Sequence, residues 1–216
     1  MVPNIEAIKA SGNGGSSREL IRSSGLYDVK IKYAYMKTKE GTQAKTLWLR
    51  VSIGNSDKQQ VLFIRQTNNN GSENFEKILV DKLLVCCDIE EVKRLVPTKF
   101  VYKEKEYFED CIKELEGKEV TLQIRQEFDK YNGKINESFK IVNIFRTRDK
   151  ASAIEIVNNA DLGKRYNTLE DNYVNSVSYK NTNKTECDAW IKAKANGNQQ
   201  QTTTNSFDTA NSEIPF

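Results

Sequence analysis

The sequence predicts a mainly β fold with a helical insert, and three observations lead to this prediction. Apolar and polar residues alternate with a period of two over residues 27–36 and 47–53 and again over residues 120–125. Between these regions, residues 72–117 carry apolar residues at helical spacing. The chain has 216 residues, 38% of them hydrophobic, which suffices for one core of ordinary size. We therefore expect three strands, a helical segment and then a two-stranded hairpin.

The first predicted strand has an apolar face and a largely basic one. Lys30 and Lys32 lie on the basic face, where they can line phosphates or simply keep the strand soluble. The apolar face is expected to pack in the core or at its end and consists of Tyr27, Val29, Ile31, Tyr33 and Tyr35.

The second and third strands are predicted at residues 47–53 and 61–65. In the second strand, Trp48 and Arg50 alternate with core-type residues and are therefore expected on the outer face. The third strand contains Phe63 and Arg65 but is apolar on both faces, so its register stays open.

The predicted helical segment covers residues 72–117. Ser72 can cap a first helix, and Asp88 with Glu91 resembles a capping box. The apolar residues at helical spacing are Phe75, Leu79, Leu83 and Cys86, and later Phe108, Ile112 and Leu115, before Gly117.

The last two strands form a predicted hairpin around Asn132-Gly133, the strongest short hairpin signal. Its tip, residues 130–134, is basic and contains Tyr131, and Arg125 points outward from the first of the two strands. This order of strands and helix is that of the OB-fold, a five-stranded Greek-key barrel with helices between strands three and four. OB-folds bind oligonucleotides on the face of strands two and three and with the loops between strands one and two and between strands four and five.

The chain divides into four predicted regions. Residues 1–24 contain a Gly/Ser/Asn-rich run and are read as a flexible segment, and residues 25–150 form the OB domain. Residues 151–195 form an extension whose packing the sequence does not specify, with a strand at 154–157 and a helix that carries Trp190 and ends at Gly197. Residues 196–216 are expected to be a disordered tail.

Composition argues against several classes of protein. Histidine is absent, which removes the commonest general base and metal ligand. The four cysteines, Cys86, Cys87, Cys111 and Cys187, lack metal-ligand spacing and are expected as reduced thiols. We expect no catalytic residues, no metal and no cofactor. The N-terminus has no apolar signal region and no long apolar run follows, so we expect a cytoplasmic protein without a membrane segment.

Charge is divided between body and tail. The chain has 33 basic and 30 acidic residues, and the segment from Asn196 onward contributes only Asp208 and Glu213. Residues 1–195 therefore carry 33 − 28 = +5 and the tail carries −2. A mildly basic body suits a polyanionic partner without requiring one.

The C-terminal residues Ser212-Glu213-Ile214-Pro215-Phe216 resemble the tip of bacterial single-stranded DNA-binding proteins, where an acidic run ends in Ile-Pro-Phe. The chance of this tripeptide at a C-terminus is roughly one in ten thousand from average residue usage. The long insert makes the chain most similar to phage- or plasmid-encoded forms, which would place it in the host cytoplasm. One departure is that Glu213 stands without consecutive acids beside it.

The resemblance implies that the tip recruits polymerase, helicase, primase or recombination proteins to coated DNA. The partner-binding residues would be Glu213, Ile214, Pro215 and Phe216. They supply an acid, an apolar side chain, a proline that limits the conformations lost on binding, and an aromatic anchor beside the terminal carboxylate. Sequence-tolerant DNA binding needs aromatic faces for stacking and basic groups for phosphates. The candidates are Trp48, Arg50, Lys30, Lys32, Phe63, Arg65, Arg125 and Tyr131.

Three other interpretations stay open. The chain could be an OB-fold RNA-binding regulator, or an adaptor that uses its tail without binding DNA. A cysteine enzyme would need Cys86 or Cys87 as nucleophile and a base other than histidine. The homo-oligomeric state is also open.

Overall fold

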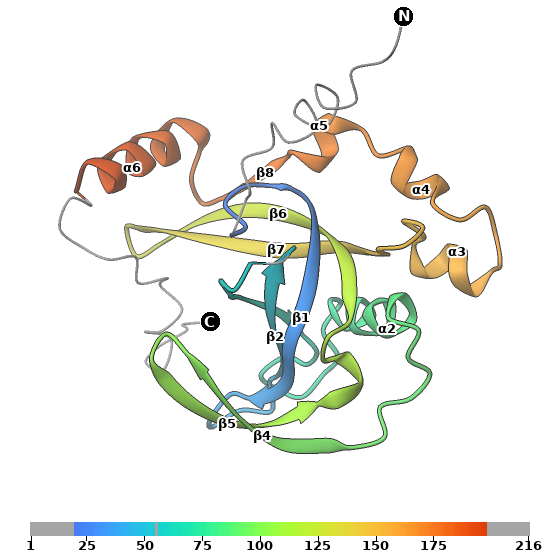
Figure 1. Ribbon diagram of the computed structural model, residues 1–216. Helices are drawn as coiled ribbons and strands as arrows, with labels where there is room; N and C mark the ends of the chain where they lie inside the picture. Colours follow the sequence, from blue (N-terminus) through green and yellow to red (C-terminus); the bar gives the residue numbers. More distant parts are fainter. Residues whose placement is uncertain (1–19, 55, 198–216) are drawn as a thin grey trace, which may run out of the picture.

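The computed structural model describes residues 20–54 and 56–197 (Figure 1). The fold is mainly β, an open eight-stranded sheet with helices around it. The strands are β1 (Gly25–Thr38), β2 (Lys45–Ile53), β3 (Gln60–Arg65), β4 (Leu95–Tyr102), β5 (Lys105–Ile112), β6 (Glu119–Tyr131), β7 (Lys134–Arg146) and β8 (Val177–Lys180). The helices are α2 (Lys77–Cys86), α3 (Ala153–Val157), α4 (Lys164–Asn167), α5 (Asp171–Val174) and α6 (Lys184–Gly197), with a 3₁₀ turn η1 at Lys113–Leu115.

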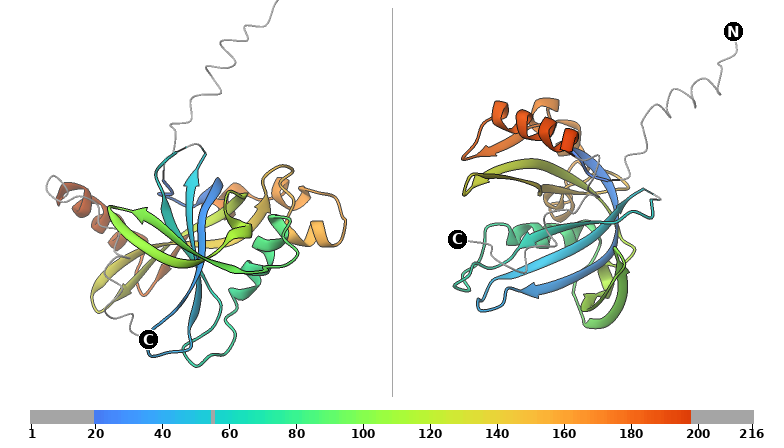
Figure 2. Two further views of the ribbon diagram at one scale, coloured as in Figure 1. Left: turned by 60° about the horizontal axis from the view of Figure 1, so that its bottom comes forward. Right: turned by 90° about the vertical axis from the view of Figure 1, so that its left-hand side faces the viewer.

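Strand β1 is the centre of the sheet. It pairs antiparallel with β2 along most of its length and with β6 through its first half. Antiparallel hairpins β2–β3, β4–β5 and β6–β7 extend the sheet, and β8 adds parallel to β6. In the right-hand view of Figure 2, α6 lies over the β6–β7 hairpin and β4–β5 lies at the opposite end of the molecule.

The sheet does not close into the predicted five-stranded barrel. Strands β3 and β7 contact each other, but no ladder of hydrogen bonds joins them within the described residues. Helix α2 contacts both strands and turns Leu79, Leu83 and Cys86 into the main core. The core is therefore completed by a helix at the point where the sheet stays open.

A β-bulge in β1 changes which residues face the core. The pairing with β2 shifts between Ile31 and Tyr33, so Lys32 is the extra residue. Tyr27, Val29 and Ile31 are buried in the core as predicted, but beyond the bulge Ala34 takes the core position. The prediction that Tyr33 and Tyr35 share the face of Val29 and Ile31 is wrong, because one extra residue turns every later side chain to the other face.

The predicted helical insert is only partly correct. Helix α2 covers Lys77–Cys86, with Glu76 rather than Ser72 as its N-cap. Residues 95–112 form the β4–β5 hairpin, whose two-residue turn places Lys103 and Glu104 at positive φ without glycine. The spacing of Phe108, Ile112 and Leu115 is therefore no helical stripe, and the Asp88/Glu91 pair caps no helix.

The region after residue 150 contacts the sheet. The strand predicted at 154–157 is wrong, because Ser152 caps helix α3 there and both its backbone N–H and its hydroxyl donate to Glu155 Oε2, at 2.7 and 2.8 Å. The helix predicted around Trp190 is present as α6. Strand β8 and α6 pack on β6 through Phe128, whose ring stacks on Tyr179 at 5.9 Å and lies edge-to-face with Trp190 at 6.1 Å, both measured between ring centroids.

The predicted flexible N-terminal run and the predicted tail with its tip, residues 212–216, lie outside the described residues, which span 20–54 and 56–197. Within those ranges, no helix has the length and apolar character to cross a membrane.

Candidate nucleic-acid interface

Three aromatic side chains form a row across the outer face of β3, β2 and β1. Phe63 pairs across the strands with Trp48, and Trp48 pairs with Tyr35. The ring centroids lie 5.9 Å apart for Trp48 and Phe63 and 6.2 Å apart for Trp48 and Tyr35. Tyr35 is fully buried, whereas Trp48 and Phe63 are partly exposed. This aromatic row therefore exposes part of the Trp48 and Phe63 rings to solvent, and base stacking requires such an exposed aromatic surface.

Two lysines lie over the aromatic row. The Lys37 ammonium is 5.3 Å from the centroid of Trp48 and 5.7 Å from that of Tyr35. The Lys140 ammonium, from β7, is 5.5 Å from the centroid of Phe63. Lys37 also pairs with Glu109 of β5 at 2.8 Å. Aromatic rings can stack with the bases of a single strand, and the lysines beside them can pair with its phosphates.

Arg50 lies inside an aromatic cage rather than on the surface. Its side chain is 2% exposed because the β4–β5 hairpin folds over it, so the expectation of an exposed Arg50 is wrong. The guanidinium carbon lies 4.0 Å from the Tyr102 centroid, 4.4 Å from Tyr107 and 5.0 Å from Phe100. Its Nε and Nη1 have no hydrogen-bond partner. Arg50 therefore ties the hairpin to β2 instead of reaching phosphate.

Tyr35 belongs to the same buried cluster as Phe100 and Cys111. Burial raises the pKa of the Tyr35 hydroxyl to about 12, against the opposing effect of the Arg50 charge. The phenol is neutral at physiological pH, and its ring packs against that of Trp48.

The other predicted DNA-binding residues are spread over the molecule. Lys30 pairs with Glu119 at 3.9 Å, and the bulge residue Lys32 is half-buried. Arg125 lies 5.5 Å from the ring of Tyr173 in α5. Arg65 ends β3 with its backbone N–H bonded to Glu76 at 2.9 Å. Of the predicted set, the structure thus brings Trp48 and Phe63 into one site, with Arg65 two residues further along β3.

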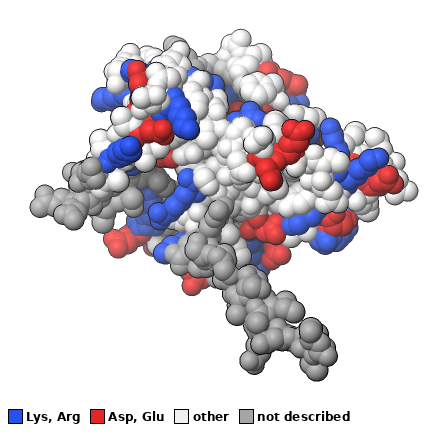
Figure 3. All heavy atoms as spheres, turned by 90° about the horizontal axis from the view of Figure 1, so that it is seen from above, with Lys and Arg blue, Asp and Glu red and all other residues white. Residues whose placement is uncertain are grey.

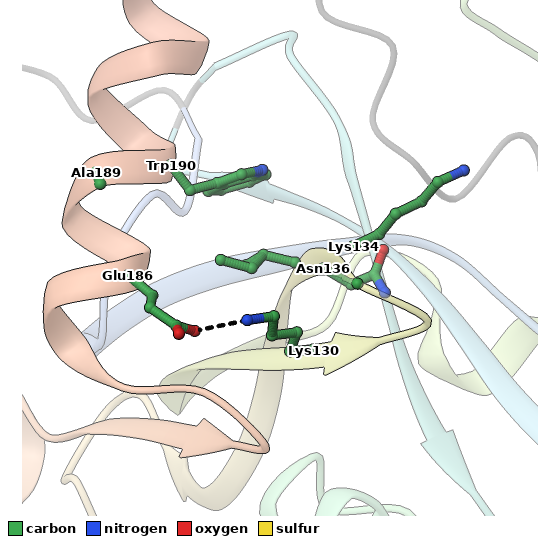
Figure 4. Close-up of a pocket in the computed structure, with 8 residues that line it drawn as sticks. Lys130, Lys134, Asn136, Glu186, Ala189 and Trp190 are labelled. Atoms are coloured by element: carbon green, nitrogen blue, oxygen red, sulfur yellow. Dashed lines mark hydrogen bonds and ion pairs between the residues drawn. The ribbon is translucent and has the colours of Figure 1, made fainter.

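Tyr131 is 45% exposed at the tip of the β6–β7 hairpin. The tip is a two-residue turn with Asn132 and Gly133 at positive φ, as the Asn-Gly pair predicts. Next to it, a pocket of about 690 Å³ opens between the hairpin and α6 (Figure 4). Its polar lining includes Lys130, Lys134, Asn136 and Glu186, and its aromatic wall is Trp190.

Charges of both signs are interspersed on the face seen in Figure 3. Among the described residues on that face, no continuous basic track stands out. On this face, binding of a polyanion would therefore depend on local basic residues more than on a uniform positive field.

The sequence interpretation missed Lys37, Lys140 and Trp190 as site residues. Lys37 follows Tyr35 with strand alternation, so a correct placement of the bulge would have found it. Lys140 reaches Phe63 only through the contact of β7 with β3, which no local pattern encodes.

The cysteines give no support to a nucleophile. All four are buried and free, and burial raises the pKa of Cys86 and of Cys87 to about 12 each. Because the thiolate is the reactive form, burial disfavours both side chains as nucleophiles at neutral pH. Within residues 20–54 and 56–197, no group of three or more Cys, Asp or Glu side chains could hold a metal ion.

We expect the native thiols to react with Ellman's reagent roughly 100-fold more slowly than those of the guanidinium-unfolded chain, because a buried thiol must first be exposed by local unfolding. A stopped-flow comparison at pH 8 measures both rates. Rapid stoichiometric labelling of one native cysteine would contradict this expectation and reopen the cysteine-enzyme interpretation.

No protein-family model, curated protein or solved structure matches the chain.

Proposed function

We propose that the chain binds and coats single-stranded DNA, largely without sequence preference and without enzymatic activity. The observation that carries the proposal is the aromatic row with Trp48 and Phe63 partly exposed and Lys37 and Lys140 over its rings. Bases would stack on Trp48 and Phe63, and the lysines would neutralise the adjoining phosphates. Stacking is tolerant of sequence because every base has an aromatic face.

The strand pairing supports an OB-like arrangement for this site. Strand β1 pairs with β2 and β6, β6 pairs with β7, and α2 follows β3, which is the wiring of that fold with β4–β5 inserted. In such folds the face of the second and third strands binds the oligonucleotide. The corresponding face here, β2 and β3, carries Trp48 and Phe63, and the hairpin turn that flanks such a site carries Tyr131.

The C-terminal tip, Glu213 to Phe216, would recruit partner proteins to the coated strand. Its resemblance to the tip of bacterial single-stranded DNA-binding proteins supports a polymerase, helicase, primase or recombinase as partner. We place the protein in replication, recombination or repair of a phage or plasmid, in the host cytoplasm.

Fluorescence anisotropy of a labelled oligo(dT) at two salt concentrations tests the DNA part of the proposal. For each phosphate neutralised, we expect the logarithm of the association constant to fall by about 0.7 when the salt concentration rises tenfold. We expect little binding to a duplex of equal length. Lack of binding to oligo(dT) at low salt would overturn the proposal and leave the tail-dependent adaptor.

Two further arms separate the remaining alternatives. Tighter binding to oligo(rU) than to oligo(dT) would favour the RNA-binding regulator, because the 2′-hydroxyl distinguishes the two strands. A variant that lacks residues 212–216 should bind oligo(dT) as the full chain does, since the tip is assigned to protein partners.

A further inference from the structure

A pocket lies beside the β6–β7 turn, and none of its lining residues belongs to the aromatic row. It is formed by Lys130, Gly133, Lys134, Ile135 and Asn136 of the hairpin and by Glu186, Ala189 and Trp190 of α6. A volume of about 690 Å³ lies within the range of small-ligand clefts. The residues come from two segments, 130–136 and 186–190, that are distant in sequence, so the pocket exists only because α6 docks on the hairpin.

Side-chain contacts hold both walls of the pocket in place. Lys130 Nζ pairs with Glu186 Oε2 at 3.1 Å, and the Thr182 hydroxyl donates to the same oxygen at 2.9 Å. The Lys130 and Thr182 hydrogen bonds lower the pKa of Glu186, so this carboxylate stays ionised and the clamp persists at neutral pH. In Figure 4 the ion pair joins the helix to the hairpin on one side of the pocket, and the Trp190 indole extends from α6 on the other.

Trp190 is oriented by its neighbours. The edge-to-face contact with Phe128 fixes the indole, and the Lys194 ammonium lies 4.7 Å from its centroid. Lys194 is itself paired with Glu137 at 3.6 Å. An aromatic ring held in this way loses little conformational entropy when a flat ligand stacks on its remaining surface.

The polar lining of the pocket offers groups that suit a nucleotide. Lys134 is exposed at the turn and reaches away from the Lys130–Glu186 pair, so its charge is available to a phosphate. The Asn136 amide can both donate to and accept from a base edge. Lys130 and Glu186 cancel each other, which leaves a net positive pocket next to Tyr131, a residue already predicted to contact DNA.

We infer that this pocket binds one nucleotide of the bound single strand, with the base on Trp190 and a phosphate on Lys134. The inference rests on the proposed single-strand binding and extends it. The face of α6 that carries Glu186, Ala189 and Trp190 becomes part of the DNA-binding surface, so the footprint extends beyond the β2–β3 face to the pocket beside the β6–β7 turn.

Single-tryptophan variants test the inference, because Trp48 and Trp190 are the two tryptophans of the chain. In Trp48→Phe, all tryptophan emission comes from Trp190. We expect saturating oligo(dT) to quench this emission, with saturation verified by anisotropy of a labelled strand. Unchanged Trp190 emission with the strand demonstrably bound would overturn the inference while the proposed function stands. Lack of strand binding by the wild-type chain would overturn both.

A charge variant gives an independent readout. Lys134→Ala should weaken oligo(dT) binding roughly fivefold at 0.1 M salt, the counterion-release value for one single-strand phosphate. The matched control is Lys192→Ala, an exposed lysine about 200° around α6 from Trp190, which should change the affinity less than twofold. Equal effects of the two variants would show a general charge effect and contradict a phosphate site at Lys134.

Discussion

Replacement of Trp48 by alanine is expected to weaken oligo(dT) binding roughly 5- to 150-fold, because stacking contributes about 1–3 kcal/mol per base. Trp48 is the centre of the aromatic row, in contact with Phe63 on one side and Tyr35 on the other. Its loss removes a stacking surface and also the ring over which Lys37 lies. Anisotropy titration of wild type and variant at one salt concentration measures the effect.

Two controls separate stacking from damage to the fold. Trp48→Phe keeps an aromatic face and should recover most of the affinity. Phe108→Ala removes an aromatic side chain that is 74% exposed on β5 and touches no part of the row, so it should bind like the wild type. Equal affinity of Trp48→Ala and wild type, with both folded by circular dichroism, would exclude the β2–β3 face as the binding surface.

Replacement of Arg50 by alanine is expected to lower the free energy of unfolding by about 2–4 kcal/mol, the range for large-to-small changes in a core. Arg50 fills the space between β2 and the rings of Tyr102, Tyr107 and Phe100. Alanine would leave a cavity under the β4–β5 hairpin. Urea denaturation followed by circular dichroism measures the change.

Arg50→Met separates packing from charge. Cation–π contacts contribute up to about 2 kcal/mol when desolvated, while burying a charge costs several kcal/mol. Nε and Nη1 of Arg50 lack hydrogen-bond partners, so the cost of burying the charge is not relieved there. We therefore expect this cost to offset the gain from the cation–π contacts. Methionine fills a similar volume and should therefore cost less than about 1.5 kcal/mol. A Met variant as unstable as the Ala variant would show that the charge itself holds the hairpin.

Strong local signals predicted the corresponding elements correctly. The alternation around Leu47–Val51 and the Asn132-Gly133 turn specified β2 and the β6–β7 hairpin, because strand periodicity and turn chemistry are local properties. Trp48 was found as a site candidate for the same reason: its position opposite three core residues follows from alternation alone.

Features that depend on tertiary contacts were not predictable. The β4–β5 hairpin turns at Lys103-Glu104, a pair without the usual turn residues. Its exposed Phe108 lies four residues before Ile112, a spacing that is also typical of one face of a helix. The burial of Arg50 follows from this hairpin, and the bulge at Lys32 exchanges the faces of β1 beyond it. The pocket at Trp190 requires α6 to dock on β6–β7, a contact between segments distant in sequence.

Photo-crosslinking with an oligo(dT) that carries 5-iodouracil, followed by mass-spectrometric mapping, tests the central claim most directly. It reports at once whether a single strand binds and which aromatic side chains touch its bases. We predict crosslinks at Trp48 or Phe63, lost upon competition with unlabelled oligo(dT). Crosslinks confined to residues 153–174, or none above a duplex control, would contradict a binding surface on β2 and β3.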